Sequence, residues 1–439
     1  MEIDKTTLAD LIIYDRDEEF SVFSKINYTL TSRGKEQLKQ NLLTPLNTID
    51  AITAVQQTLL FINKNTTQWH LQVSNGTLLM VERFYEAQID VIPSNISPIG
   101  ALSYKLFHSF DFSLIKFSVK HCFDFIKGMQ QLVTFFLNDD TPTLLKIQLQ
   151  DVQRILNHKA LQLIANKNSA AQLSPQNTLQ LAYFIKYTYK SNMHSLLSIF
   201  GKLDAWYGMA TAVNKLKLAM PLFVKNELPI INAKGMYHIM IEQAVTYDLE
   251  LDKSKNFLFL TGANMAGKST FIKACGTAVY LAHIGMGVPA KQMQLSFFDG
   301  ILSNINVIDD IAKGESYFYN EVQRIKATVQ KVSNGKKWLI LIDELFKGTN
   351  VQDAMKCSTT VIEGLLKIKT SLFILSTHLY EIGDALKHHQ NLSFNYFETK
   401  IVDDQLQFSY QLKEGISNDR LGYLILKKEG VVRLLENIA

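Results

Sequence analysis

Residues 257–274 of this 439-residue chain read FLFLTGANMAGKSTFIKA: an apolar run, a loop with two glycines, and the start of a helical pattern. The loop has the spacing Gly262-x-x-x-x-Gly267-Lys268-Ser269, between an expected buried strand and an expected helix, which is the context that a phosphate-binding loop needs. Its glycines let backbone N–H groups turn toward phosphate, and the helix N-terminus adds positive potential. We predict an ATP site in which Lys268 reaches the β- and γ-phosphates and the Ser269 hydroxyl ligates Mg²⁺.

A second segment supplies acids at the end of an expected strand. Residues 337–344 read KWLILIDE, so Asp343 and Glu344 follow an apolar run directly. Ligands of open α/β sheets bind at the carboxyl ends of strands, where both acids would face the phosphates. We expect Asp343 to hold Mg²⁺ through water and Glu344 to orient or deprotonate the attacking water. A third apolar run, 372–375, leads to His378, which we predict to sense the γ-phosphate at the same sheet edge.

The pattern around these segments predicts a mostly parallel sheet that is covered on both faces. Short apolar runs alternate with helical stretches after residue 236, as expected of such a sheet. Strict alternation over 406–412, facing 392–400, predicts an edge hairpin. The expected strands are 238–241, 247–251, 257–260, 339–342 and 372–375, and the expected helices are 268–283, 315–332 and 352–367.

The first half of the chain predicts helices instead. Between Leu102 and Phe200 the only glycine is Gly128, and Ser174-Pro175 opens a helical pattern that runs nearly unbroken to about Leu218. We therefore expect an α plus α/β fold: a helical core over 1–110, long lever helices over 111–220 with a reduced or absent clamp, and a P-loop ATPase domain over 221–439.

Composition and charge narrow the class of protein. The chain is 47% hydrophobic and 20% charged, with a net charge of +4, which is ordinary for a globular protein and excludes disorder as its main state. The three cysteines have no metal-site spacing, and no apolar run is long enough to span a membrane, so we expect a cytoplasmic location and no membrane partner. Residues 112–202 carry ten basic and four acidic side chains. This excess indicates either an anionic partner such as DNA or simply a solvated helix face.

Four segments together resemble the ATPase domain of the MutS family. They are TGANMAGKST (261–270), DDIAKGESYFYNEV (309–322), LILIDELFKGTN (339–350) and STHLYEI (376–382), in the family's order of Walker A, signature, Walker B with D-loop, and His switch. A weaker similarity to the MutS core covers 27–45, and another to the end of its lever covers 203–207. The resemblance thus extends over nearly the whole chain but is strong only from about residue 236.

The resemblance implies a homodimer with composite ATP sites and an ABC-type ATP cycle. By position, Ser316 is the signature serine that would contact the nucleotide of the opposite subunit. The nucleotide-binding set carried over to this sequence is Gly262, Asn264, Met265, Ala266, Gly267, Lys268, Ser269, Thr270 and Ser316, with Ser269 and Asp343 as Mg²⁺ ligands and Glu344, Lys268 and His378 as catalytic residues.

Departures from the family pattern lead to further expectations. Ala263 and Ala266 replace a family proline and glycine, Glu315 replaces the signature arginine, and Lys347 replaces an arginine of the D-loop. We also expect the mismatch-recognition and connector domains to be absent, together with any nuclease module, so that this chain alone does not recognise mismatches directly.

Three functions remain open from the sequence. The first is a MutS-like DNA-binding ATPase that uses ATP to open and close a dimer on DNA, in DNA repair or recombination. The second is an ATP-gated scaffold that recruits repair proteins and binds DNA weakly or not at all. The third, a metabolic P-loop kinase, is disfavoured by Glu344, by Ser316 and by the long expected lever.

Overall fold

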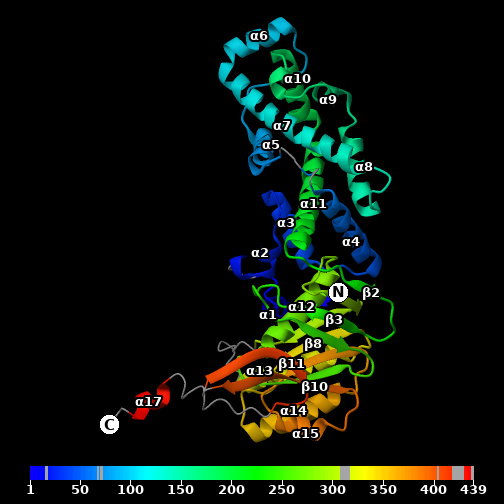
Figure 1. Cartoon of the computed structure of the whole chain (residues 1–439). Helices are drawn as coiled ribbons and strands as arrows, with labels where there is room; N and C mark the ends of the chain where they lie inside the picture. Colours follow the sequence, from blue (N-terminus) through cyan, green and yellow to red (C-terminus); the bar gives the residue numbers. More distant parts are fainter. Residues whose placement is uncertain are drawn as a thin grey trace. The chain divides into compact units, whose positions relative to one another are not determined.

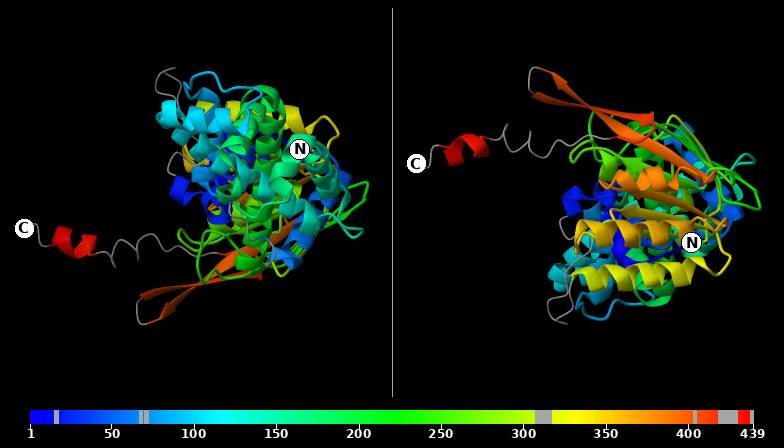
Figure 2. Two further views of the ribbon diagram at one scale, coloured as in Figure 1. Left: turned by 90° about the horizontal axis from the view of Figure 1, so that it is seen from above. Right: turned by 90° about the horizontal axis from the view of Figure 1, so that it is seen from below.

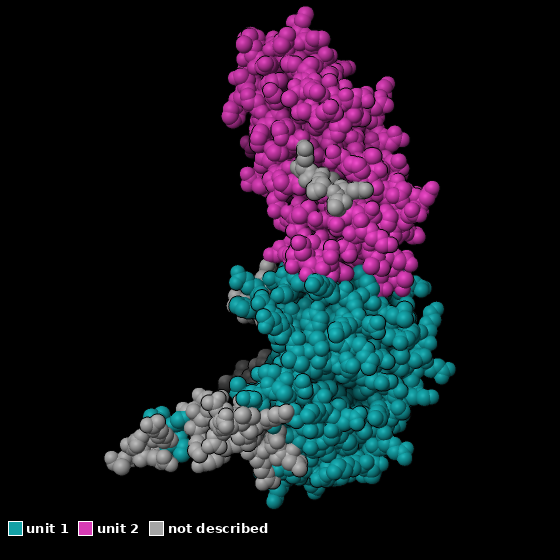
Figure 3. Space-filling model, viewed as in Figure 1, with its two compact units in different colours: residues 1–25, 44–52, 216–439 teal, residues 26–43, 53–215 magenta. Residues whose placement is uncertain are grey.

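The computed structural model describes residues 1–14, 18–66, 69, 73–306, 317–402, 405–417 and 430–436. The chain divides into two compact units (Figure 3). Unit 1 comprises residues 1–25, 44–52 and 216–439, and unit 2 comprises residues 26–43 and 53–215. Each unit is therefore assembled from segments that are far apart in the sequence.

Unit 1 is built on a seven-stranded sheet with the order β1-β7-β8-β9-β5-β10-β11 (Figure 1). Neighbouring strands are parallel from β1 to β10, and β11 is antiparallel to β10. The strands are β1 (Glu2–Ile3), β5 (Phe257–Thr261), β7 (Gly300–Asn304), β8 (Trp338–Asp343), β9 (Ser371–Ser376), β10 (Leu392–Val402) and β11 (Gln405–Glu414). A mostly parallel sheet and the edge hairpin are thus confirmed, and Figure 2 shows the hairpin projecting from the sheet.

Helices cover both faces of this sheet, as its almost wholly buried central strands require. On one face lies α12 (Lys268–His283), whose Gly276 packs against Leu341 of β8. On the other face, one apolar cluster joins β5, β8 and β9 to α13 (Tyr317–Val332), α14 (Val351–Leu365) and α15 (Glu381–Leu386). This packing fixes the carboxyl ends of β5, β8 and β9, where the sequence places its chemistry.

A second, four-stranded sheet has the order β2-β6-β3-β4. Its strands are β2 (Leu222–Val224), β6 (Gln292–Ser296), β3 (Ile231–Met236) and β4 (Tyr247–Leu251). Residues 238–241, which we expected to be a strand, form a turn after β3. Unit 1 also contains α1 (Lys5–Asp10), a 3₁₀ turn (Glu18–Phe20) and α17 (Val431–Glu436), while α2 (Val22–Ile26) and α4 (Ile49–Lys64) cross the division between the units.

The secondary structure of the described residues of unit 2 consists of helices and turns. Its helices are α3 (Ser32–Leu43), α5 (Asn75–Glu86), α6 (Pro98–Phe107), α7 (Ser109–Phe136), α8 (Thr143–Leu156), α9 (Gln162–Ala165), α10 (Pro175–Tyr183) and α11 (Lys190–Lys215), with short 3₁₀ turns at Lys159–Leu161 and Ala170–Gln172. The helix expected from 174 to 218 begins as predicted, because Ser174 caps it by accepting a hydrogen bond from the Asn177 N–H. It is not one continuous α-helix, since a π-helical turn (Phe184–Thr188) and Tyr189 separate α10 from α11.

A buried carboxylate joins two distant segments of unit 2. Asp204 of α11 is fully buried and accepts hydrogen bonds from the backbone N–H groups of Leu30 and Thr31 and from the Thr31 hydroxyl, at 2.6–2.9 Å. These contacts tie α11 to the start of α3.

No helix among the described residues is both long enough and apolar enough to cross a lipid bilayer.

Candidate nucleotide site

The phosphate-binding loop predicted from the sequence joins β5 to α12. Gly262 and Gly267 have φ angles of +142° and +110°, and Met265 between them has +68°. The φ angles at positions 262 and 267 favour glycine, because a residue with a side chain would be strained there. At Gly262, moreover, a Cβ atom would approach Phe397 to 3.3 Å. The glycines are therefore required by the turn itself, which leads directly into the N-terminus of α12.

Lys268 is the first residue of α12, and its side chain folds back into the loop. Its Nζ donates hydrogen bonds to the carbonyl oxygens of Gly262 and Ala263, at 2.9 and 3.1 Å. Burial lowers the pKa of Lys268, and the negative charges of Glu344 and Asp343 partly oppose that shift. Because an ammonium group has three donors, one N–H remains for an anion beyond these two loop contacts.

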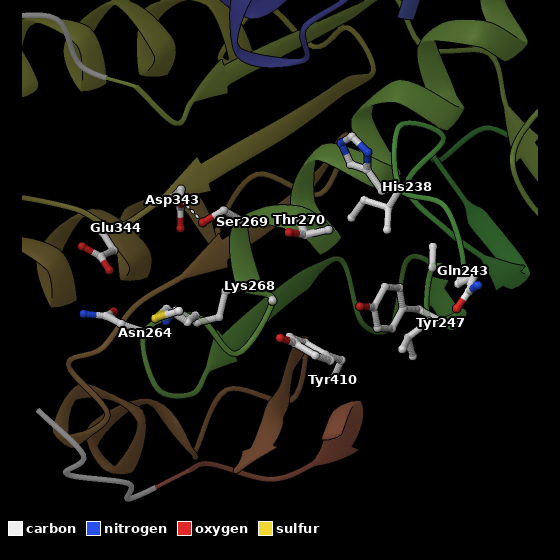
Figure 4. A pocket seen from close by; sticks show the side chains of 15 residues that line it. His238, Gln243, Tyr247, Asn264, Lys268, Ser269, Thr270, Asp343, Glu344 and Tyr410 are labelled. Carbon is white, nitrogen blue, oxygen red and sulfur yellow. Dashed lines mark hydrogen bonds between the residues drawn. The ribbon is translucent and has the colours of Figure 1, made fainter. Parts of the chain in front are cut away.

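Ser269 and Asp343 bring two oxygen ligands together beside the loop. The Ser269 hydroxyl donates a hydrogen bond to Oδ2 of Asp343 at 2.5 Å (Figure 4). The other carboxylate oxygen, Oδ1, accepts a hydrogen bond from the hydroxyl of Ser376, the residue that pairs with Asp343 across β8 and β9. Hard oxygen donors of this kind suit Mg²⁺, so the residues present fit the ion that the loop implies.

Glu344 lies beside the same cavity and is surrounded by positive groups. Its Oε1 is 3.3 Å from Nδ1 of His378, and its Oε2 is 3.4 Å from Nζ of Lys347. Burial by itself would raise the pKa of Glu344, but the His378 hydrogen bond and the charges of Lys347, His378 and Lys268 lower it to about 2. The same hydrogen bond raises the pKa of His378. Glu344 is consequently an ionised carboxylate at neutral pH.

A residue without a role in the sequence analysis, Glu321 of α13, holds the segment that follows Glu344. Its side chain is buried, and its two carboxylate oxygens accept hydrogen bonds from the backbone N–H groups of Lys347 and Gly348, at 3.1 and 3.2 Å. Glu321 belongs to the 309–322 segment that resembles the family signature, but nothing in its spacing indicated this contact.

The cavity beside the loop has a volume of about 530 Å³. The acids Asp343 and Glu344 lie to one side of the loop, and Tyr247, Gln243 and His238 lie to the other (Figure 4). Tyr410 of the hairpin also lines the cavity. Sequence reasoning missed these last four residues, because they come from a turn and two strands whose side chains meet only in the fold.

The aromatic side of the cavity is ordered by ring contacts. The Tyr247 ring packs edge-on against Phe271 and Phe397, with centroid distances of 5.3 and 5.7 Å. Burial lowers the pKa of His238 to about 4, so its imidazole is neutral at pH 7. This side is therefore uncharged and carries an aromatic ring, opposite the charged side.

Most of the residues predicted for the nucleotide meet at this cavity. Gly262, Ala266 and His378 do not line the cavity. Gly262 and Ala266 belong to the loop, and His378 contacts Glu344. Ser316 lies outside the described residues. The predicted residues that line the cavity are Asn264, Met265, Gly267, Lys268, Ser269, Thr270, Asp343 and Glu344.

Comparison with known proteins finds a similar family in the part of the chain that carries this cavity. A family model for MutS domain V matches residues 258–434. The DNA mismatch repair protein MutS of Petrotoga mobilis is 29% identical over 245 residues, which cover 55% of this chain and 30% of that protein. The MutS proteins of Thermotoga maritima and Oceanobacillus iheyensis are 30% and 28% identical, and the matched stretches cover 31% and 27% of their lengths.

The matched stretch thus spans less than a third of each of these relatives. All four segments that carried the resemblance, between residues 261 and 382, lie within residues 258–434, which the family model matches. The strand-to-helix loop, the two acids at the carboxyl end of β8 and the histidine after β9 also stand in the order that the family motifs predict. Residues 258–434 of this chain are therefore similar to domain V of the MutS proteins.

Proposed function

We propose that this chain binds ATP with Mg²⁺ in the cavity of unit 1 and hydrolyses it. The observation that carries the proposal is the convergence of Lys268, the Ser269–Asp343 pair and Glu344 on one cavity of about 530 Å³. This volume is typical of small-molecule sites. One side of the cavity provides charged and oxygen groups for phosphates and a cation, and the other provides aromatic rings for a base.

Each residue has a distinct task in this proposal. The loop backbone and Lys268 bind the β- and γ-phosphates, and Ser269 and Asp343 hold the cation. When bound, Mg²⁺ neutralises charge that develops on the phosphoryl oxygens. Tyr247 and Tyr410 hold the adenine by stacking, because both aromatic rings line the cavity.

Glu344 orients the water that attacks the γ-phosphorus in line and accepts its proton. An ionised carboxylate is needed for this task, and the groups around Glu344 lower its pKa accordingly. His378 fixes the direction of the carboxylate through its hydrogen bond. Lys268 and the loop N–H groups stabilise the negative charge of the transition state.

The cycle is proposed to open and close a homodimer on DNA in DNA repair or recombination. This step rests on the similarity of residues 258–434 to MutS domain V and on the net positive charge of residues 112–202. In the dimer, Ser316 would reach the nucleotide of the opposite subunit, so that each ATP site is composite. Direct mismatch recognition is not part of the proposal.

One observation favours the second candidate, an ATP-gated scaffold with weak DNA binding. Several basic side chains of 112–202 are engaged within unit 2. Lys120 and Arg154 form ion pairs with Asp124 and Asp151. Lys127 and Lys186 donate hydrogen bonds to backbone carbonyl groups. These contacts reduce the positive charge that is free to meet DNA phosphates.

Binding of a fluorescent ATP analogue with Mg²⁺ tests the site directly. Lys268→Ala is expected to weaken binding or to reduce turnover at least ~100-fold, since it removes a charge-assisted contact to phosphate. Lys253→Ala is the matched control, because Lys253 is exposed and does not line the cavity. Unchanged binding and turnover in Lys268→Ala would remove the site assignment.

A further inference from the structure

Helix α6 of unit 2 presents apolar side chains outward. Ile99, Leu102 and Leu106 are 81%, 58% and 73% exposed, and their spacing places them on one face of the helix. Two phenylalanines follow at the junction with α7, Phe107 at 78% and Phe110 at 80% exposed. We name these five residues the tip surface; α6 lies at the end of unit 2 remote from α3 (Figure 1).

The helix that carries this surface packs through Ala101 and has ordered ends. Ala101 is fully buried, and the Tyr104 ring stacks on His108 with a centroid distance of 4.8 Å. At its N-terminus, Ser97 caps the helix by accepting a hydrogen bond from the Gly100 N–H at 3.1 Å. The tip surface is therefore held in place, and its apolar residues face solvent in the single chain.

We propose that the tip surface binds the tip surface of a second copy of this chain. At 150–200 Å² for a fully exposed large side chain, its five residues expose on the order of 600 Å² of apolar area. A stable interface buries about 800 Å² per partner, of which roughly 60% is apolar. The tip surface alone supplies that apolar share, and it equals the largest patch expected on a typical monomer.

The charged side chains around the tip surface favour a second copy of this chain over DNA or an anionic lipid surface as its partner. Lys105 of α6 is exposed, with its Nζ 5.9 Å from the centre of the Phe112 ring, and exposed Asp90 lies 3.5 Å from Nδ1 of His108, the residue between α6 and α7, with Asp111 beside them. In a two-fold contact each surface meets itself, so neighbouring charges of both signs can pair across it. DNA and anionic lipid surfaces would instead call for an excess of basic side chains.

This contact goes beyond the proposed ATP cycle, because nothing in it involves nucleotide. It would join two copies through unit 2, in addition to the ATP-dependent contact proposed for unit 1. The tip contact needs no nucleotide and the unit 1 contact needs ATP, so the two contacts can be tested separately.

Sedimentation velocity of the full chain without nucleotide, at 1–100 µM, tests the proposal. We expect a dimer with a dissociation constant on the order of micromolar, as an interface of this size permits. Leu106→Glu/Phe107→Glu should raise that constant at least ~100-fold, because it sets like charges against each other. The control is Ile147→Glu on α8, where the wild-type residue is 50% exposed and lies outside the tip surface.

Two results would overturn the proposal: a wild-type chain that is monomeric at 100 µM, or a Leu106→Glu/Phe107→Glu variant that dimerises like the wild type. Circular dichroism confirms that the variants fold. Binding of the wild type, but not of the variant, to anionic phosphatidylglycerol vesicles or to duplex DNA, without self-association, would replace the second copy by that partner.

The same experiment with ATP separates this proposal from the proposed function. In the Glu344→Gln background, ATP should still drive the tip variant to dimerise through unit 1. Loss of only the nucleotide-free dimer supports the tip contact and leaves the ATP cycle standing. If ATP drives no dimer in that background even with an intact tip surface, the proposed composite site fails and the tip contact does not.

Discussion

Oε1 of Glu344 lies 3.3 Å from Nδ1 of His378, which places the proposed general base beside a second titratable group at the ends of neighbouring strands. β8 and β9 are parallel and in register at this point, since Asp343 pairs with Ser376. The Glu344 N–H also donates to the Ser376 carbonyl at 2.9 Å. The backbone of two strands thus fixes the carboxylate before any ligand binds.

Glu344→Gln is expected to bind ATP and to lose turnover. The amide keeps the shape of the side chain but accepts protons poorly, so hydrolysis should fall at least ~100-fold. Nucleotide affinity should stay equal or rise, because a negative charge beside the phosphates is removed. Steady-state turnover and equilibrium ATP binding measure the two effects, with exposed Glu363→Gln on α14 as control. Turnover at the wild-type rate would exclude Glu344 as the base.

The His378 pKa should depend on Glu344. In the wild type the pKa of His378 lies above 6.5. The ion pair between His378 and Glu344 is therefore fully formed just below pH 6.5 and is lost as the pH rises through the raised pKa of His378. In Glu344→Gln the hydrogen bond that raises it is gone, while burial and the charges of Lys268 and Lys347 remain, so it should fall below 6.5. NMR titration measures this change, with His238, whose burial lowers its pKa to about 4, as an internal reference. A His378 that titrates alike in both proteins would contradict the pairing.

Glu321→Gln should lower kcat with little change in KM for ATP. The carboxylate accepts from two N–H groups that follow Glu344, and an amide can accept from only one without opposing the other. We expect kcat to fall about 10-fold, since hydrogen bonds to charged acceptors contribute about 1.5–3 kcal/mol. Glu363→Gln again serves as the control. An unaltered kcat would mean that this segment does not position the catalytic group.

Gly34→Ala should destabilise unit 2. A Cβ atom at Gly34 of α3 would lie 2.1 Å from Oδ2 of Asp204, which is fully buried and hydrogen-bonded to the start of α3. Such overpacking costs about 1–3 kcal/mol. Gly76→Ala on α5 is the matched control, because its Cβ atom would meet no atom closer than 3.7 Å. Thermal unfolding compares the two; equal midpoints would show that α3 can shift at no cost.

Local sequence patterns predicted several central strands of unit 1 and its helix α12 correctly. The strands β4, β5, β8 and β9 and the helix α12 lie where the apolar runs and the loop motif predicted them, because each is specified by its own residues. The hairpin β10–β11 also follows its alternation. The acids and the lysine of the cavity come from motifs of fixed spacing.

Pairings between distant segments could not be predicted in the same way. β1 has two residues and exists because Glu2 and Ile3 pair with Gly300 and Ile301. Glu321, Tyr247 and Tyr410 reach the site through tertiary packing, which no local period records. The π-helical turn at Phe184–Thr188 interrupts a sequence whose apolar spacing reads as continuous helix.

The central claim is that ATP hydrolysis in unit 1 is coupled to DNA. Its most direct test is steady-state ATP hydrolysis by the full chain with no DNA, perfect duplex, mismatched duplex and a branched junction, with Glu344→Gln as the blank. We predict Mg²⁺-dependent turnover above the blank that changes with at least one DNA, and the DNA with the largest effect identifies the ligand. Turnover that is equal under all four conditions would contradict the coupling and favour the scaffold, and turnover no higher than the blank would contradict the ATPase itself.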